Sequence, residues 1–193
     1  MRKNLGAKPF IYPLPVLIIA AYDENSVANA MNAAWGTVAD FNQVAIYLAK
    51  DHKTTQNILN TRAFTVSIAD AMHTKEADYL GIVSGNKVPN KIENAGLHVV
   101  KSEFVNAPII EEFSLTMECK MVSYDEEAEL MIGEIMNVSA NESILDEKDK
   151  IDVKKLNPLA YDTANHAYYT LGEKVGNAFR DGKELDKWLV LMK

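Results

Sequence analysis

The stretch "EFSLTMECKM", residues 112–121, alternates apolar and polar side chains at every position. Successive side chains of a β-strand point to opposite faces, so this pattern predicts a strand with one buried face and one wet face. A half-buried strand is typical of antiparallel sheets, because parallel sheets are covered on both sides. The buried set would be Phe113, Leu115, Met117, Cys119 and Met121.

A second apolar run, "ELMIGEIMNVSA" at residues 129–140, follows the acidic turn at 125–127. Two strands that close together in sequence predict a β-hairpin. Gly133 interrupts the second strand, and glycine inside a strand is typical of a bulge or a sharp curl of the sheet. We therefore expect the sheet to bend at Gly133.

Further strands and two helices are expected earlier in the chain. Strands are predicted at 16–22, from Val27 onward, at 44–48 and at 64–68, the first two forming a hairpin over "DEN". Asp51 is expected to cap a helix that turns Ile58 and Leu59 inward. A second helix is expected over 74–83, stopped at Gly85, and a charged surface helix over 146–157.

Many short strands joined by hairpins, with few helices, favour a mainly β protein: a closed or nearly closed antiparallel barrel with flanking helices. Residues 1–193 show no linker or repeat, and 48% are hydrophobic, so we expect one domain with a full core. The apolar tail at 188–192 is expected to pack against its own domain or against a second chain.

Charge and composition exclude several classes. A net charge of −7 argues against a nucleic-acid partner, and the lysines of 148–155 are interleaved with aspartates as on a solvated surface. The most apolar stretch, 14–22, is far shorter than the roughly 20 residues of a membrane-spanning helix. One cysteine and no secretory leader predict a cytoplasmic protein, with Cys119 a buried thiol rather than a redox or metal group.

Motifs for several chemistries are missing. The four histidines lack the paired spacing of a zinc or iron site, so no metal is expected. Neither a G-x-S-x-G elbow nor the glycine-rich loops of common nucleotide-binding folds occurs. No residue is therefore proposed as a nucleophile or a catalytic acid or base.

An anion site is suggested by "KDHKTTQN", which places Lys50, His52, Lys53, Thr54 and Thr55 at the expected start of the first helix. Free backbone amides and the helix dipole favour a negative charge there, and hydroxyls and a lysine add donors. The alternative is that Asp51 simply caps a solvated helix. The segment alone does not decide between the two.

The stretch "NAMNAAWG" likewise has two interpretations. Small side chains let a strand pair closely with its neighbour and end in a core tryptophan. They also let a flat ring lie against the backbone. Amide groups would then form hydrogen bonds with the ring's polar edge, and Trp35 would form one side of the pocket. The residues concerned are Asn29, Ala30, Met31, Asn32, Ala33, Ala34 and Trp35.

The order "YPLPVLIIAAYDEN…NAMNAAWG…DHKTTQNI…AFTVSIA…SGNKVPNKIENAGL…PLAYD…HAYYTLGEKVGNAF" resembles the flavoredoxin branch of the flavin reductase-like, FMN-binding split-barrel proteins. The resemblance covers nearly the whole chain, from Lys8 to Gly182. It implies a Greek-key antiparallel split β-barrel that forms a homodimer with FMN near the interface.

Carried over by position, the resemblance implies that 29–35 line the flavin ring and that 52–55 receive the phosphate. Lys91 in "NKIENAGL" matches a family lysine that faces the flavin region, although Lys87 is an alternative and a solvated loop lysine is the simpler interpretation. The "HK" of the phosphate segment departs from many relatives, which leaves open which side chain pairs with the phosphate.

Another departure is the acidic "EEAEL" at 126–130, which puts in doubt a role for that turn at the flavin's exposed edge. The tyrosines 161, 168 and 169 fall in a segment similar to the family's "YY-x-LGE", where packing or dimer contact is expected rather than catalysis.

The resemblance implies an FMN-binding oxidoreductase that reduces flavin with NADH or NADPH. The alternative is a flavoredoxin-type electron carrier that exchanges electrons with a redox protein and does not turn over nicotinamides. A barrel without a cofactor, serving as an interaction module, is a third possibility. Flavin itself carries the electrons, so the missing catalytic motif agrees with either redox function.

Overall fold

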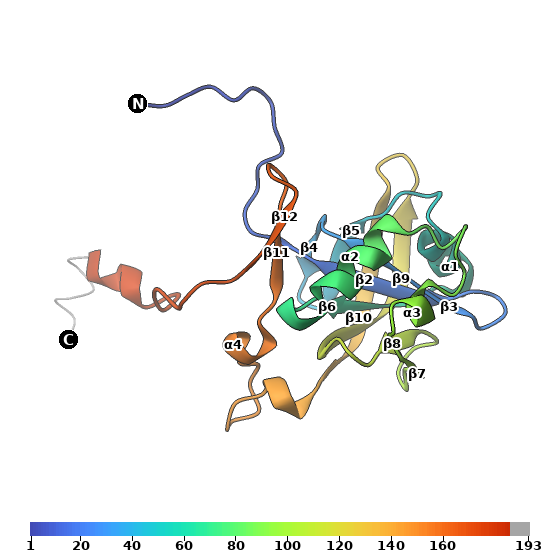
Figure 1. Ribbon diagram of the computed structural model, residues 1–193. Coiled ribbons are helices and arrows are strands. Elements are labelled where there is room, and N and C mark those ends of the chain that lie inside the picture. Colours follow the sequence, from blue (N-terminus) through green and yellow to red (C-terminus); the bar gives the residue numbers. More distant parts are fainter. Residues whose placement is uncertain (186–193) are drawn as a thin grey trace.

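The computed structural model describes residues 1–185, and its main feature is a curled antiparallel sheet of seven strands (Figure 1). The strands lie in the order β3-β2-β6-β9-β10-β5-β4. Since β3 and β4 are joined by only two residues and lie at opposite ends of this order, the sheet must curl back on itself. The strands are β2 (Leu17–Tyr22), β3 (Ala28–Ala33), β4 (Gly36–Asp40), β5 (Gln43–Tyr47), β6 (Ala63–Ile68), β9 (Leu115–Asp125) and β10 (Leu130–Ala140).

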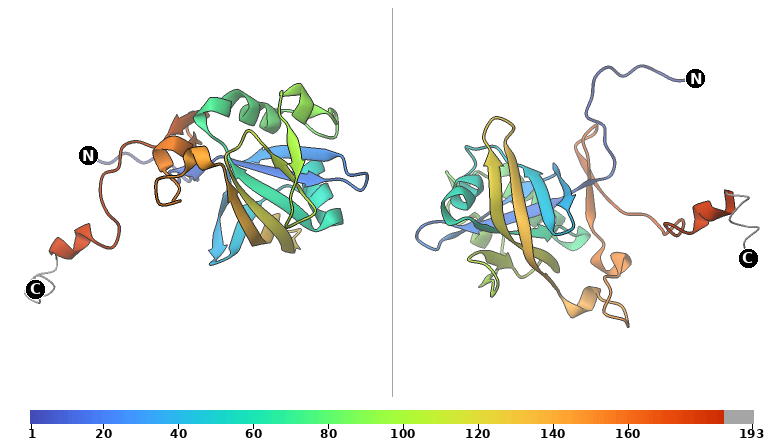
Figure 2. Two further views of the ribbon diagram at one scale, coloured as in Figure 1. Left: turned by 90° about the horizontal axis from the view of Figure 1, so that it is seen from below. Right: turned by 180° about the vertical axis from the view of Figure 1, so that it is seen from behind.

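Smaller elements surround this barrel. A second sheet has the order β1-β11-β12, and β7 pairs with β8. The N-terminal and C-terminal segments extend away from the barrel (Figure 2). The additional strands are β1 (Leu14–Pro15), β7 (Val99–Lys101), β8 (Pro108–Ile110), β11 (Leu159–Asp162) and β12 (Ala167–Thr170); the helices are α1 (Lys53–Thr61), α2 (Thr74–Ile82), α3 (Lys91–Asn94) and α4 (Val153–Leu156), with 3₁₀ turns at Ala71–His73, Glu142–Ile144 and Asp181–Leu185.

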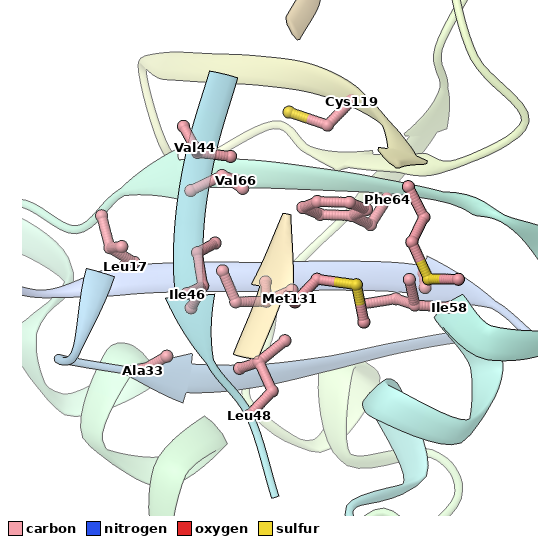
Figure 3. Packing of buried hydrophobic residues seen from close by; sticks show 13 residues of the cluster. Leu17, Ala33, Val44, Ile46, Leu48, Ile58, Phe64, Val66, Cys119 and Met131 are labelled. Carbon is pink, nitrogen blue, oxygen red and sulfur yellow. The ribbon is translucent and has the colours of Figure 1, made fainter. Parts of the chain in front are cut away.

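Strand β2 is buried on both faces, which explains why its sequence is continuously apolar. Leu17 and Ile19 point into the barrel core. Ile18 and Ala20 belong to a second cluster shared with α2 and α3, which we call the outer cluster. The barrel core is filled by residues of β5, β6, β9, β10 and α1, including Ile46, Ile58, Phe64, Val66 and Met131 (Figure 3). The sheet is therefore covered by α2 and α3 on one side and filled by its own interior on the other.

The β9–β10 hairpin confirms the strongest prediction from the sequence. The register shifts between Ile132 and Gly133, as expected for a bulge at that glycine. A Cβ at Gly133 would lie 2.4 Å from Cζ of Phe64, so the Phe64 ring occupies the space that a side chain at position 133 would need. Cys119 is fully buried in the barrel core, and burial raises the pKa of its thiol to about 12. The prediction of a buried thiol is confirmed.

The predicted wet face of β9 is wrong in its middle. Thr116 and Glu118 are both buried, and the Thr116 hydroxyl shares a hydrogen bond with that of Ser67 on β6 at 2.8 Å. Glu118 accepts a hydrogen bond from Asn137 Nδ2 at 2.7 Å and another from the Ser102 hydroxyl. A carboxylate can be buried when two donors bond it. The polar face of an alternating strand therefore need not lie in solvent.

Three helix predictions need correction. Asp51 is not the cap of α1: His52 occupies the N-cap position and makes no side-chain capping bond. Helix α2 ends at Ile82, and its C-cap Val83 is extended, so Gly85 is not a left-handed cap. The charged segment 146–157 is mostly turns, and only Val153–Leu156 is helical, capped by Asp152.

Several elements were not predicted: β1, β4, β7, β8, β11, β12 and α3. They are short, and β4 is almost entirely exposed, so hydrophobic periodicity does not mark them. The apolar tail at 188–192 lies outside the described residues. Within residues 1–185, no helix is long and apolar enough to cross a membrane.

Candidate functional site

The candidate site is built on β3, which is an edge strand of the seven-stranded sheet. It pairs with β2 on one side only, from Ala28 opposite Tyr22 to Ala33 opposite Leu17. Every second residue of an antiparallel edge strand therefore turns its backbone N–H and C=O away from the sheet. These free groups are what a planar ligand with a polar edge needs.

A hollow of about 160 Å³ lies between β3, the start of α1 and the end of α2, and we call it the β3 hollow. It brings together seven of the residues that the sequence proposed for the site, together with the segment that follows α2. The lining residues are Asn29, Met31, Asn32, His52, Lys53, Thr54, Lys91 and the segment Leu80–Gly85.

Asn29 fixes the relation between β3 and α1. Its side chain is buried, and its Oδ1 accepts a hydrogen bond from Thr54 Oγ1 at 2.9 Å. A Cβ on Gly85 would lie 2.4 to 2.8 Å from the Asn29 amide, so only glycine allows the loop after α2 to approach this closely. Three elements distant in sequence therefore meet at one buried amide.

The start of α1 has the features of an anion site. Its first turn contains no acidic residue, and within residues 1–185 no protein acceptor bonds the backbone N–H groups of Lys53, Thr54 and Thr55. Thr55 Oγ1 is buried and has no hydrogen-bond partner in that part of the chain. Buried donors without partners are costly, so a ligand with several acceptor oxygens fits this turn.

Lys53 has one carboxylate nearby. Its Nζ lies 3.8 Å from Asp23 Oδ2, while Asp23 Oδ1 accepts hydrogen bonds from the backbone N–H groups of Asn25 and Val27 at 2.9 Å. Asp23 lines a neighbouring hollow of about 330 Å³, which shares Asn29, Lys53 and Gly85 with the β3 hollow. Asp23 could not be predicted as a site residue from the sequence, where it belongs only to an expected turn.

Lys91 is not a solvated loop residue, since only 2% of its surface is exposed. Its Nζ donates to the carbonyl oxygens of Leu80 at 3.0 Å and Val83 at 2.8 Å, the last turn of α2. Burial lowers the pKa of Lys91 to about 8. Two N–H groups match two carbonyls, and the third N–H of the ammonium form has no protein acceptor within residues 1–185.

The five remaining proposed residues, Thr55 among them, do not line the β3 hollow. Ala30 and Ala33 are buried, in the outer cluster and the barrel core respectively. Ala34 is half-buried, and Trp35 is 54% exposed, so the alternative of a core tryptophan is wrong. Trp35 lines a separate apolar hollow of about 670 Å³ together with Ile11, Val38 and Tyr47.

Within residues 1–185, no group of three or more histidine, cysteine, aspartate or glutamate side chains is placed to hold a metal ion. The site offers backbone N–H and C=O groups, side-chain hydroxyls, two side-chain amides and two lysines. Such a set can bind a phosphate and the polar edge of a flat ring, and it contains no nucleophile paired with a base.

The curled sheet and the site on its edge strand define a split-barrel protein of the flavin reductase type. Residues 10–171 match the model of the family described as "Flavin reductase like domain", and the chain belongs to that family. The flavoredoxin of Desulfovibrio vulgaris (Miyazaki F) is 35% identical, with a TM-score of 0.90 over 94% of this chain and 100% of that one.

Two further proteins are similar to this chain. A flavoredoxin from Methanosarcina acetivorans is 31% identical, with a TM-score of 0.85 over 96% of this chain and 98% of that chain. An uncharacterized protein of Aeropyrum pernix is 30% identical over 64% of this chain, which spans about half, 48%, of that relative. The mainly β split-barrel fold is therefore confirmed.

The lowered pKa of Lys91 predicts a pH effect on stability. The folded protein releases this proton near pH 8 and the unfolded chain near 10.5, so the unfolded state binds more protons in between. The free energy of unfolding should therefore rise with pH across that window, by at most about 3 kcal/mol.

Denaturant unfolding of the wild type and of Lys91→Met at pH 7 to 10 checks this. The two hydrogen bonds lost in the variant lower its stability at every pH, so the informative quantity is the difference between the two proteins. That difference should grow with pH, and a constant difference would show that Lys91 keeps an ordinary pKa.

Proposed function

We propose that this chain binds FMN at β3 and acts as an NAD(P)H-dependent flavin reductase-like oxidoreductase. The observation that carries the proposal is the β3 hollow, which joins the edge strand β3 to a helix start whose amides bond no acceptor within residues 1–185. Membership of the flavin reductase-like family supports the class of cofactor. Flavin, when bound, accepts hydride or single electrons and passes them on.

The residues present fit a flavin with a single phosphate. Residues 29–34 would hold the ring's polar edge, largely through the free backbone groups of β3. His52, Lys53, Thr54 and Thr55 would receive the phosphate mainly through first-turn backbone amides and the Lys53 ammonium, since the Thr54 hydroxyl already donates to Asn29 Oδ1. We assign the phosphate pairing to Lys53 rather than His52, because Lys53 lines both neighbouring hollows whereas His52 lines only the β3 hollow.

The third N–H of Lys91 is available to an acceptor in the β3 hollow. A negative charge there would favour the protonated lysine and offset the burial that lowers its pKa. Trp35 would wall the ring only at the end of β3 that faces the apolar hollow. Each of these roles belongs to binding and orientation, and none requires the protein to supply a proton or a nucleophile.

A flavoredoxin-type electron carrier is the second candidate. It is favoured by two flavoredoxin structures that match this chain along nearly all of its length, at 35% and 31% identity. In this function a redox protein, and not a nicotinamide, would supply the electrons. The buried thiol of Cys119 fits the reducing cytoplasm, where we propose that either function takes place.

The protein purified with its cofactor should be yellow, with the absorbance bands of oxidised flavin, and should release FMN on denaturation. Anaerobic addition of NADH and then NADPH separates the two candidates. Saturable bleaching of the flavin bands supports the reductase. A flavin reduced only by chemical or protein donors supports the carrier. A colourless protein that does not bind added FMN would leave only a barrel without a cofactor.

The phosphate assignment predicts opposite effects of two substitutions. Lys53→Ala should raise the Kd of FMN about 10-fold, because it removes a charge-assisted contact. Asp23→Asn should lower it a few-fold, because it keeps an acceptor for the N–H groups of Asn25 and Val27 and removes a negative charge 3.8 Å from Lys53.

Fluorescence titration with FMN and with riboflavin measures both effects. Riboflavin lacks the phosphate, so its affinity should not respond to either substitution. Lys50→Ala is the matched control, since Lys50 pairs with Glu126 and lines neither hollow. Equal effects on FMN and riboflavin would contradict the phosphate assignment.

A homodimer is also part of the proposal. The apolar hollow beside Trp35 is formed by prolines 9, 13 and 15 with Ile11, Leu14, Val38 and Tyr47, and most of its surface is carbon. In the C-terminal segment, Val175 and Phe179 are also fully exposed in the isolated chain. Monomeric proteins seldom expose contiguous apolar surface of this kind, and a second copy of the chain would cover it.

Sedimentation velocity should therefore give the mass of a dimer, close to twice 21.5 kDa. Val38→Lys, which places a charge on the exposed strand β4, should shift the protein toward monomer without unfolding it. A monomeric wild type at micromolar concentration would argue against this interface.

A further inference from the structure

Tyr168 lies on β12, outside the barrel sheet, yet its hydroxyl reaches the helix that covers the candidate site. The phenol donates a hydrogen bond to Asp78 Oδ1 on α2 at 2.8 Å. The ring packs with the outer cluster, 5.9 Å from the ring of Tyr161. Its neighbour Tyr169 is exposed and makes no such bond in the described part of the chain. The two adjacent tyrosines therefore occupy different environments.

Helix α2 in turn holds Asn32. The amide Nδ2 of Asn32 donates to the carbonyl oxygen of Ala77 at 3.0 Å, one residue before Asp78. A Cβ at Gly81 would lie 3.1 Å from the Asn32 Cβ, so the helix backbone packs directly on this side chain. Within residues 1–185, Asn32 Oδ1 has no partner, which leaves one acceptor beside the β3 hollow.

We infer that Tyr168 is a positioning residue for the flavin site: its hydroxyl, through Asp78, holds α2 where Ala77 and Gly81 orient the amide of Asn32. This rests on the proposed binding of flavin at β3. At its other end α2 is held by Lys91, through the carbonyls of Leu80 and Val83. The helix is thus fixed at its middle from β12 and at its end from α3.

The physical basis is the strength of a hydrogen bond to a carboxylate in a partly buried place. Burial and the neighbouring Asp78 raise the pKa of Tyr168 to about 12, so the phenol keeps its proton and remains a donor. Loss of that donor frees the middle of α2 to shift by a fraction of an ångström. A site that depends on the placement of one amide is sensitive to such a shift.

The test compares Tyr168→Phe with Tyr169→Phe. Tyr168→Phe removes one oxygen and keeps the ring, and it should raise the Kd of FMN about 3- to 10-fold. Tyr169→Phe should leave the Kd unchanged. Asp78→Asn retains an oxygen acceptor for the phenol but loses the charge, so its Kd should lie between those of the wild type and Tyr168→Phe, whereas Asp78→Ala should match Tyr168→Phe. The double variant Tyr168→Phe, Asp78→Ala should be no worse than either single one.

A second readout does not depend on flavin. In the ligand-free protein, NMR of the Asn32 side-chain amide should show faster hydrogen exchange and a changed chemical shift in Tyr168→Phe, and wild-type behaviour in Tyr169→Phe. A circular dichroism spectrum like that of the wild type confirms that the variant is folded.

The outcomes separate this inference from the proposed function. If the wild type binds FMN and Tyr168→Phe binds it equally tightly, Tyr168 has a structural role only and the inference is overturned. If the wild type does not bind FMN, the proposed function fails. The NMR result then decides whether Tyr168 orients Asn32, and an unchanged Asn32 amide would overturn that as well.

Discussion

The hydrogen bond between Thr54 and the buried amide of Asn29 is the contact on which the candidate site depends. It joins the edge strand β3 to the first turn of α1, and Gly85 closes over it from the loop after α2. Replacing any of the three would move the strand edge relative to the helix start. A ligand that uses both a backbone edge and a helix N-terminus needs that distance fixed, because its ring and its phosphate are joined covalently.

The sequence predicted the fold well where side-chain periodicity carries the information. The β9 strand and the buried Cys119 follow from alternation of apolar and polar residues, and the bulge follows from the glycine at position 133 of its hairpin partner. The prediction was wrong at Glu118, which looks like a solvent-facing residue of the alternating strand. Its burial depends on Ser102 and Asn137, which reach it from other strands and segments, and no local pattern reports that.

The candidate site could also be predicted only in part from local sequence. Asn29, Asn32, Lys53 and Thr54 stand out because their residue types are unusual between apolar runs. Lys91 was found only through the family resemblance, since a lone lysine in a polar loop is ordinarily solvated. Its burial follows from the fold of the segment 80–91, which brings the amine back to the carbonyls at the end of α2.

Trp35 and Tyr168 lie at two different places on the protein, the apolar hollow and the helix beside the β3 hollow. Strand β3, which ends at Ala33, turns the Asn32 amide toward α2, and two residues after its end Trp35 lines the separate apolar hollow. Residues after the barrel then return over α2, where Tyr168 bonds Asp78. The additional sheet of β1, β11 and β12 therefore contributes to both places: its first strand lines the apolar hollow, and its last strand holds the helix of the β3 hollow. Because β11 pairs with both outer strands, the strand that lines the apolar hollow and the strand that bonds α2 belong to one continuous sheet.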